Sequence, residues 1–449
     1  MNTVNIRQIA DEGVDINYPI WHPYSSINKN YFHMLNIVKG EGVFLYDVNG
    51  RKYLDASSGL WNVSLGYGNN KIKNYIKNQL DNLSFCSLFY NTSSVAVVCA
   101  NSLFSILPSY FKKIFFNCSG SASIELAMKA MRMYWALNGN PDKNIIMGFK
   151  GSYHGTYYGS MGVSGYSQNY IDGFRPSVGN IHFFEAGICS KCEEKLNYPD
   201  CNMDCISELK SFVEENAKKI AGIILEPILA SYGTLIMSKK YIEKLQLLCD
   251  ENNILLAFDE VTVGFYRTGS AFYLNKFDVQ PDIICMSKGI NSGYLPFGAT
   301  AFSSKICKTF EECNGMLFHG STQDGNLLAC ASCIATIDQY KELNISKNVS
   351  TMGGYIINEL KTILSYHRNV GDIWGEGLII QINLVKNSRK HEFLNKDQIS
   401  LIISQLLRNG LIVTNSDTGI ALLPMLIINK QEADYMLDII QGTFKNIFF

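Results

Sequence analysis

Apolar and polar residues alternate along the chain in blocks that predict strands and helices in turn. Short runs rich in Ile, Leu and Phe predict buried strands, and longer runs with helical spacing of apolar residues stand between them. The predicted strands are FKKIFFN (111–117), IAGIILEP (220–227), NILLAFDE (253–260) and DIICMSK (282–288), with helices over 121–137, 205–219 and 241–252. Buried strands that alternate with helices indicate an α/β fold with a mostly parallel sheet covered on both faces.

The two ends of the chain follow a different pattern. In residues 40–59 the turn sequence DVNG joins two strand-like runs, which predicts a β-hairpin. Near the other end, helical runs such as SLIISQLLRNG alternate with short strands such as LIVTNS and IALLP. We therefore predict a large domain over residues 71–329 and a smaller α/β domain that combines residues 1–70 with residues 330–449.

Composition narrows the classes of function. The chain has 449 residues, 47% of them hydrophobic, which is enough for a large core. Its formal net charge of −1 gives no reason to expect a nucleic acid or an anionic membrane as partner. The sequence contains no apolar run long enough for a transmembrane helix and begins without a secretory signal, so we expect a cytoplasmic protein.

The chain contains 13 cysteines, and four of them form a cluster. Scattered thiols in a large chain favour reduced cysteines over a disulfide framework. Paired cysteines also occur in zinc sites, but here the second pair has C-x3-C spacing and the linker between the pairs is short. We favour a surface excursion with reduced thiols and predict no metal, while zinc stays an alternative for Cys189, Cys192, Cys201 and Cys205.

Polar residues follow the predicted strands at their carboxyl ends, the edge where ligands bind in such sheets. One of them is Lys288, delivered into a glycine-rich loop by the apolar run IICM. Burial of an ammonium is costly, yet a lysine beside apolar walls becomes a neutral amine that forms Schiff bases with aldehydes. Asp259, which follows LLAF, is either a cap or a buried carboxylate with a cationic partner such as a protonated pyridine nitrogen. About one helix and one strand separate the two, so both should emerge at the same edge.

Two further stretches fit the same chemistry but have ordinary alternatives. Gly120 and Ser121 lie where a strand meets a helix, and a helix N-terminus binds phosphate, although a plain serine N-cap is equally consistent. In KGSYHGTYYGS, Tyr153 and His154 stand between glycines. Tyr153 either lies flat on a cofactor ring or packs as an ordinary loop tyrosine.

Taken together, these motifs resemble one family. The stretches GLWNVSLGYG, SGSASIELAMK, YHG, ILEP, FDEVTVGFYRTG, SKGINSGYLPFGA and HGSTQDGNLLACA occur in this order between residues 59 and 331. They resemble class III aminotransferases of the omega-aminotransferase type, which are pyridoxal 5′-phosphate (PLP) enzymes of fold type I. The resemblance covers nearly the whole chain.

The resemblance implies a role for each matching position. Lys288 would form the Schiff base with PLP and move the proton, Asp259 would bond the pyridine nitrogen, and Glu226 would face the substrate. Val261 and Tyr153 would pack on the two ring faces, with His154 beside them. Gly120 and Ser121 would hold the phosphate, and Thr322 would reach it from a partner subunit, which implies a homodimer with sites at the interface. The Cys-rich stretch is also similar to an insertion of some members that is not a cofactor site.

Departures from the family pattern concern the substrate. Ala122 and Ile124 replace a usual glutamate and a polar residue. The arginine that often grips an α-carboxylate falls on Thr414, and no Lys or Arg occurs from Leu411 to Asn429. Another arginine, Arg175 or Arg389, could substitute for it. Glu226 would then be free to meet a substrate ammonium, and the aromatic residues Trp61 and Tyr24 would suit an apolar or extended substrate.

We therefore predict a PLP-dependent aminotransferase that moves an amino group from an amine or amino acid to an aldehyde or ketone, in a biosynthetic or amine pathway. The acceptor would be a small molecule or a carbonyl carried by a peptide. An aminomutase or a decarboxylating relative would use the same residues. A non-catalytic binding protein of this fold would be expected to lack Lys288 or Asp259, and a nicotinamide dehydrogenase would need a G-x-G-x-x-G turn that is absent after the first strand.

Overall fold

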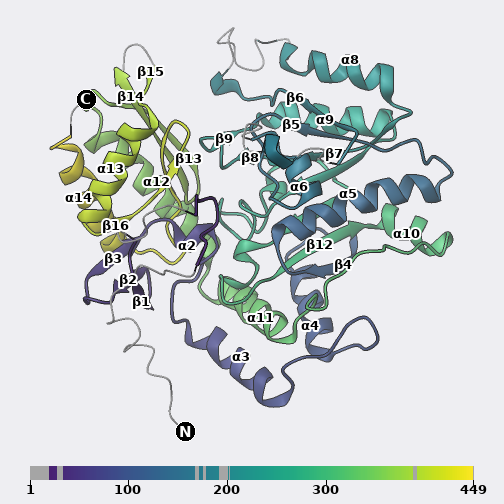
Figure 1. Ribbon diagram of the computed structural model, residues 1–449, viewed down its shortest axis with the longest axis horizontal. Helices are drawn as coiled ribbons and strands as arrows, with labels where there is room; N and C mark the ends of the chain where they lie inside the picture. Colours follow the sequence, from purple (N-terminus) through teal and green to yellow (C-terminus); the bar gives the residue numbers. More distant parts are fainter. Residues whose placement is uncertain are drawn as a thin grey trace.

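The chain folds into a large and a small domain that lie side by side (Figure 1). The computed structural model describes residues 20–27, 34–166, 171–174, 178–191, 201, 203–387 and 392–447. In Figure 1 the large domain, coloured teal to green, lies to the right of the small domain, which combines the purple start of the chain with its yellow-green end. Within the described residues, no helix is long and apolar enough to cross a membrane.

The large domain is built on a seven-stranded sheet with the order β4-β12-β11-β10-β7-β5-β6. Strand β12 is antiparallel to both of its neighbours, and the remaining strands run parallel to one another. The fold class is the predicted one. The strands are β4 (Phe111–Asn117), β5 (Ile145–Phe149), β6 (Ile181–Phe184), β7 (Ile220–Leu225), β10 (Leu255–Asp259), β11 (Ile283–Met286) and β12 (Gly298–Ser303).

Helices cover this sheet because its strands are apolar on both faces. On β11, Ile283 and Cys285 join a core cluster with residues of α5 (Gly120–Leu137). The alternate residues Ile284 and Met286 belong to the cluster that includes side chains of α9 (Lys239–Glu251). Successive side chains of a strand point to opposite faces, so a strand without polar positions is buried from both sides.

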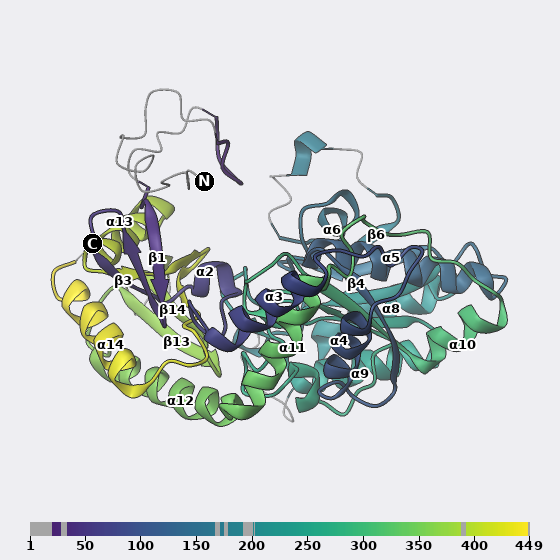
Figure 2. The ribbon, with the colours of Figure 1, turned by 90° about the horizontal axis from the view of Figure 1, so that it is seen from below.

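The remaining helices that precede α12 in the chain complete this part of the molecule. Helices α3 and α4 both pack against α11, and the three lie near the middle of the view in Figure 2. The short strands β8 (Ile228–Leu229) and β9 (Leu235–Ile236) pair with each other. The helices are α2 (Ser58–Trp61), α3 (Asn70–Asn82), α4 (Ser94–Phe104), α6 (Tyr158–Gly162), α8 (Ser207–Asn216), α10 (Ser304–Glu312) and α11 (Leu327–Glu342). Short 3-10 helices cover Asp172–Phe174, Cys189–Lys191, Asp204–Ile206, Tyr273–Lys276 and Lys288–Asn291.

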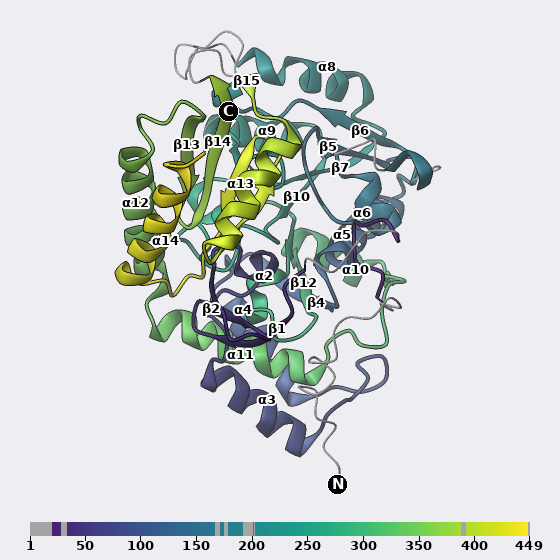
Figure 3. The ribbon, with the colours of Figure 1, turned by 60° about the vertical axis from the view of Figure 1, so that its left-hand side comes forward.

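The small domain joins both ends of the chain in one sheet. The predicted hairpin is present as β2 and β3, and β16 from the C-terminal part pairs in parallel with β3. A second, antiparallel sheet has the order β13-β14-β18-β17, with β15 paired to β14. Helices α13 and α14 lie in front of these strands in Figure 3. The elements are β1 (Ile37–Glu41), β2 (Phe44–Asp47), β3 (Lys52–Asp55), α12 (Ile345–Ile363), β13 (Val370–Glu376), β14 (Ile379–Asn387), β15 (Glu392–Phe393), α13 (Lys396–Arg408), β16 (Leu411–Ile412), β17 (Thr414–Ser416), β18 (Gly419–Leu422) and α14 (Lys430–Phe444).

A buried arginine joins the two domains. Arg267 of the large domain is almost fully buried, and its guanidinium donates hydrogen bonds to the backbone carbonyls of Leu378 and Pro424. The backbone N–H of Leu378 donates in turn to the carbonyl of Arg267, with an N···O distance of 3.0 Å. Gly377 has no room for a side chain, since a Cβ would lie 2.7 Å from the Arg267 carbonyl oxygen. The predicted boundaries at residues 70 and 329 stay predictions.

Candidate active site

The carboxyl ends of neighbouring strands bring the predicted site residues to one edge of the large sheet. Strand β10 pairs in parallel with β7 on one side and β11 on the other, with Phe258 opposite Leu225 and Asp259 opposite Cys285. Glu226 follows β7 directly, and Lys288 lies two residues beyond the end of β11. The register therefore places Glu226, Asp259 and Lys288 side by side, as the strand ends predicted.

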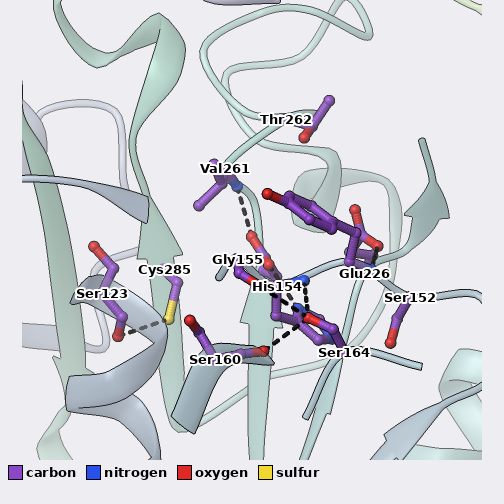
Figure 4. Close-up of polar contacts among 12 residues, drawn as sticks. Ser123, Ser152, His154, Gly155, Ser160, Ser164, Glu226, Val261, Thr262 and Cys285 are labelled. Atoms are coloured by element: carbon purple, nitrogen blue, oxygen red, sulfur yellow. Dashed lines mark hydrogen bonds and ion pairs between the residues drawn. The ribbon is translucent and has the colours of Figure 1, made fainter. Parts of the chain in front are cut away.

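Asp259 is a buried carboxylate with two donors. Only 4% of the residue is exposed, and its Oδ2 lies 2.7 Å from Nδ1 of His154 (Figure 4). Its Oδ1 accepts a hydrogen bond from the backbone N–H of Val261 at 3.0 Å. An ionised carboxylate only accepts hydrogen bonds, so Nδ1 of His154 carries the hydrogen. The buried Nε2 of His154 has no partner among the described residues.

Glu226 lies next to Asp259 and is 3% exposed. Its Oε2 accepts a hydrogen bond from the backbone N–H of Tyr153 at 2.7 Å. Burial raises the pKa of Glu226 well above its usual range, and the charge of Asp259 acts in the same direction. On the outer side, the hydroxyl of Tyr153 lies 2.8 Å from the hydroxyl of Tyr24, a residue that is 78% exposed.

Lys288 begins a short 3-10 helix in a left-handed backbone conformation, with φ +44°. A non-glycine residue in this region is strained, and such strain concentrates at functional sites. Its Nζ donates a hydrogen bond to Thr262 Oγ1 at 2.7 Å and lies 5.2 Å from the centre of the Trp61 ring. Burial lowers the pKa of Lys288, while the charges of Asp259 and Glu226 oppose this change. The net lowering increases the fraction of neutral, nucleophilic amine.

The N-terminus of α5 forms a tight turn against the strand that carries Asp259. Ser119 caps the helix by accepting a hydrogen bond from the backbone N–H of Ala122. A Cβ on Gly120 would lie 2.9 Å from Cγ1 of Val261, so only glycine fits without displacing that side chain. The hydroxyl of Ser121 accepts a hydrogen bond from the backbone N–H of Thr156 at 3.3 Å. The first N–H groups of this 18-residue helix therefore lie close to Val261.

A strained turn presents Trp61 to Lys288. Ser58, Gly59 and Trp61 all have positive φ, at +49°, +71° and +67°. The buried carboxylate of Asp55 holds this turn by accepting hydrogen bonds from the backbone N–H groups of Ser57 and Gly59 and from the hydroxyls of Ser57 and Tyr67. The indole N–H of Trp61 donates to Thr414 Oγ1 at 3.2 Å. The position at which the family resemblance leads us to expect an arginine is thus a threonine bonded to an aromatic ring.

Hydrogen bonds supply no arginine to this position in the described part of the chain. No hydrogen bond joins an arginine of the described residues to Thr414 or Glu226, and Arg267 is bonded to backbone carbonyls at the domain junction. Burial lowers the pKa of Arg267 to about 10, so it stays charged at neutral pH. Arg175 and Arg389, the substitutes considered from the sequence, lie outside the described residues.

Thr322 is exposed on a loop, and no hydrogen bond joins it to Lys288, Asp259 or Glu226 in the described residues. The loop is joined to the turn before α5, because Sγ of Cys118 lies 3.3 Å from Oδ1 of Asp324. Of the cysteine cluster, Cys192 lies outside the described residues, Cys189 and Cys201 are free thiols, and Cys205 is exposed. No group of three or more metal-ligating side chains is arranged around a common point in the described residues.

Two residues of the site were not predicted from the sequence. Thr262 follows Asp259 by three positions and bonds Lys288, but a threonine in a turn has no pattern that marks it. Asp55 ends a strand and could have been noticed by the rule used for Asp259. It lies in the small domain, however, where no ligand edge was expected.

Comparison with known proteins assigns the family. The profile described as Aminotransferase class-III matches residues 24–444. An adenosylmethionine-8-amino-7-oxononanoate aminotransferase from Staphylococcus aureus is 32% identical over 95% of this chain and 96% of its own length. An omega-aminotransferase from Caulobacter vibrioides is 31% identical over 94% of this chain and 96% of its own length. The chain therefore belongs to the class III aminotransferases.

Solved structures agree with this assignment. An amine transaminase from an uncultivated Pseudomonas species, solved in a PLP-bound form, has a TM-score of 0.91 at 29% identity over 95% of this chain and 98% of its own. An aminotransferase from Bacillus anthracis has the same TM-score at 30% identity and covers both chains completely. The protein is an enzyme, an aminotransferase of fold type I with PLP as its cofactor.

Proposed function

We propose that this aminotransferase delivers the amino group to an aldehyde or ketone that has no α-carboxylate, from an amine or amino acid donor. The observation that carries the proposal is the hydrogen bond between Trp61 and Thr414, beside Lys288. It puts an indole and a hydroxyl where a carboxylate would need a cation. A buried carboxylate without a charged partner is costly, so such a site discriminates against α-keto acids.

The proposal assigns the cofactor to the cluster around Lys288. PLP supplies an aldehyde carbon that bonds amines and a ring that accepts the electrons of a carbanion. Lys288 would provide the bonding amine, and Asp259, fixed by His154, would hold a proton on the ring nitrogen. Val261 and Tyr153 would contact the ring, and the N-terminus of α5 with Gly120 and Ser121 would bind the phosphate. The close approach of Gly120 to Val261 and the buried carboxylate of Asp259 suit this group.

The names of similar enzymes support the substrate class. The Staphylococcus aureus relative is named for 8-amino-7-oxononanoate, in which the ketone is separated from the carboxylate by most of the carbon chain. A relative from Pseudomonas aeruginosa, 28% identical, is a putrescine–pyruvate aminotransferase; its name gives a diamine donor, which fits the proposed donor class, and an α-keto acid acceptor, which does not fit the proposed acceptor class. Trp61 and Tyr24 would line the pocket for an extended substrate. The carboxyl group of Glu226, protonated or ionised, would hydrogen-bond the amine of the substrate.

The decisive test compares acceptors. We expect kcat/KM for pyruvate and 2-oxoglutarate to lie well below the value for an aldehyde or ketone without an α-carboxylate, at fixed donor and saturating PLP. Thr414→Arg should improve α-keto acids and harm the other acceptors, because arginine supplies a bidentate partner. Thr414→Lys, with a charge but no planar fork, is the matched control. If α-keto acids are the best acceptors of the parent enzyme, the proposed substrate class is wrong. Product analysis in the same assays would also detect an isomerised or a decarboxylated donor, which an aminomutase or a decarboxylating relative would form.

The cofactor lysine has its own test. Borohydride reduction of the PLP-loaded enzyme followed by peptide mapping should place the label on Lys288, and a label on another lysine would refute the assignment. Lys288→Ala should keep the ability to bind PLP through its phosphate but lose turnover, since the bonding amine and the group that moves the proton are both gone.

We also propose a homodimer whose sites lie at the interface, with Thr322 reaching the cofactor phosphate of the partner subunit. Large apolar side chains are exposed on loops near Thr322: Tyr90 is 90% exposed, Phe318 87% and Phe89 59%. Phe89 packs against the loop of Thr322, since a Cβ on Gly320 would lie 2.7 Å from its ring. Sedimentation should give twice the chain mass, and Thr322→Val should weaken PLP binding while Thr322→Ser retains it. A monomer with full activity would contradict this arrangement.

A further inference from the structure

We propose that Thr262 is a positioning residue for Lys288, whose hydroxyl holds the amine in place whenever the lysine is not bonded to the cofactor. The inference rests on the proposed role of Lys288. It goes further because it assigns a function to a turn residue in the stretch FDEVTVGFYRTG to which neither the family resemblance nor the strand pattern gave a role.

Geometry is the first argument. The Nζ–Oγ1 distance of 2.7 Å is short for a hydrogen bond to a hydroxyl, and Thr262 is only 9% exposed, so water does not readily replace it. Figure 4 shows Thr262 on the segment that continues from Val261, above the side chains around His154 and Glu226. A lysine side chain has four rotatable bonds and gains precision only from fixed contacts at its end.

Strain in the backbone is the second argument. Lys288 has φ +44° and Ser292, at the end of the same 3-10 helix, has φ +55°. Backbone strain of this kind concentrates at functional sites. The side chain of the strained Lys288 ends at Thr262 and near the Trp61 ring, so its amine has a fixed acceptor.

The charges around the amine define what Thr262 adds. Asp259 at the end of β10 and Glu226 at the end of β7 favour the ammonium form, His154 contacts only the far side of Asp259, and burial favours the neutral amine. None of these groups donates to or accepts from Nζ directly among the described residues, whereas Thr262 does. The hydroxyl oxygen of Thr262 accepts a stronger hydrogen bond from an ammonium group than from a neutral amine. Removal of the hydroxyl should therefore lower the pKa of Lys288.

The experiment measures Lys288 in the absence of PLP. Cofactor-free parent, Thr262→Val and Thr262→Ser are labelled with a trace of an amine-reactive acetylating reagent across a pH series, and the label on Lys288 is quantified by mass spectrometry. Valine has the shape of threonine without its hydroxyl, and serine keeps the hydroxyl. We expect the pH midpoint of Lys288 labelling to fall by roughly one pH unit in Thr262→Val. In Thr262→Ser the midpoint should match that of the parent.

Turnover provides the second readout. In the PLP-loaded enzymes, kcat of Thr262→Val should fall roughly tenfold or more with KM little changed, because the amine is no longer held at its working position. The kcat of Thr262→Ser should be close to that of the parent. If Thr262→Val does not fold, Thr262→Ala is compared with Thr262→Ser in its place. Unchanged Lys288 midpoints and kcat in the hydroxyl-free variant would overturn the inference. A borohydride label on a lysine other than Lys288 would instead overturn the proposed function, whatever Thr262 does.

Discussion

Two buried carboxylates and one lysine meet at the end of three neighbouring strands, and their different surroundings give them different tasks. Asp259 has two donors, His154 and the N–H of Val261, which stabilise its charge. Glu226 has one donor and lies beside the charge of Asp259, so its pKa is raised. Burial and the neighbouring charge of Asp259 therefore favour the protonated form of Glu226.

Asp259→Asn is expected to retain the fold and lose most activity. The amide would still accept a hydrogen bond from Val261, but it cannot hold a proton on a pyridine nitrogen as a carboxylate does. One well-placed electrostatic group is worth on the order of 3 kcal/mol in the transition state, so kcat should fall by two orders of magnitude or more. Circular dichroism and thermal unfolding of the variant check the fold, and kcat with saturating PLP checks the role.

Asp259→Glu serves as the matched control because it keeps the charge and shifts its position. It should recover part of the activity. Turnover of the asparagine variant within twofold of the parent would show that Asp259 is not the partner of the ring nitrogen.

The residues that end apolar strands could be predicted from the sequence, and those held in turns could not. Lys288, Asp259 and Glu226 each follow a run of buried residues, so their position at one edge follows from the parallel sheet. Thr262 and Asp55 act through turns whose backbone is set by distant contacts. The carboxylate of Asp55, for example, is bonded by Tyr67, twelve residues away. Periodicity carries no information about such contacts.

Helix α5 and the loop before it show how an element is fitted to its neighbours. The helix packs across five strands of the sheet, and its first residue lies against Val261. The element and its type were predicted from its helical spacing, and its start was placed within one residue. Its closeness to Val261 was not predictable, because it depends on how the turn after β10 is folded.

Gly120→Ala is expected to weaken PLP binding with little loss of global stability. The new methyl group would lie 2.9 Å from Cγ1 of Val261 and must displace that side chain, which we propose to contact the cofactor ring. Small-to-large changes in packed regions typically cost 1–3 kcal/mol, which corresponds to roughly a tenfold to hundredfold weaker PLP affinity if the strain falls on the bound state. Equilibrium titration with PLP, followed by its absorbance, measures the change.

A double variant tests whether the contact between the new methyl group and Val261 causes the weaker PLP binding. Val261→Ala removes the side chain that Gly120→Ala would strike, so adding it should recover part of the PLP affinity. Gly354, which has open space around its Cα, provides a neutral position for the same substitution. Equal PLP affinity of parent and Gly120→Ala would exclude the steric explanation.

The fold class followed from the pattern of buried strands: the mostly parallel sheet, the covering helices and the small domain built from both ends agree with the prediction. Strands β5, β6 and β12 of the large sheet were not predicted. The antiparallel direction of β12 has no mark in its burial, because GATAFS is buried on both faces like its parallel neighbours. Direction depends on the connection that precedes a strand, and β11 and β12 are joined by the loop of Lys288 rather than by a long helix.

Arg267→Met is expected to destabilise the enzyme by about 3 kcal/mol. Methionine fills a similar volume but leaves the carbonyls of Leu378 and Pro424 without their donor in a buried region. Calorimetry should show a lower Tm, with the small domain unfolding earlier than the large one. Arg267→Lys, which keeps one donor and the charge, should have a Tm between those of the parent and of Arg267→Met. A methionine variant with the melting profile of the parent would show that the junction gains nothing from the guanidinium.

The same junction limits how a substrate can enter. The guanidinium of Arg267 fastens the small domain to the segment that begins at Asp259, so a rigid rotation of that domain would pull on the residues that we propose to do the chemistry. In the segment over residues 20–27, the exposed Tyr24 reaches the site through the contact between its hydroxyl and that of Tyr153. We expect entry and product release to be gated by this short surface segment. The rate at which this segment opens, rather than the rate of domain closure, would then limit the rate of each half-reaction.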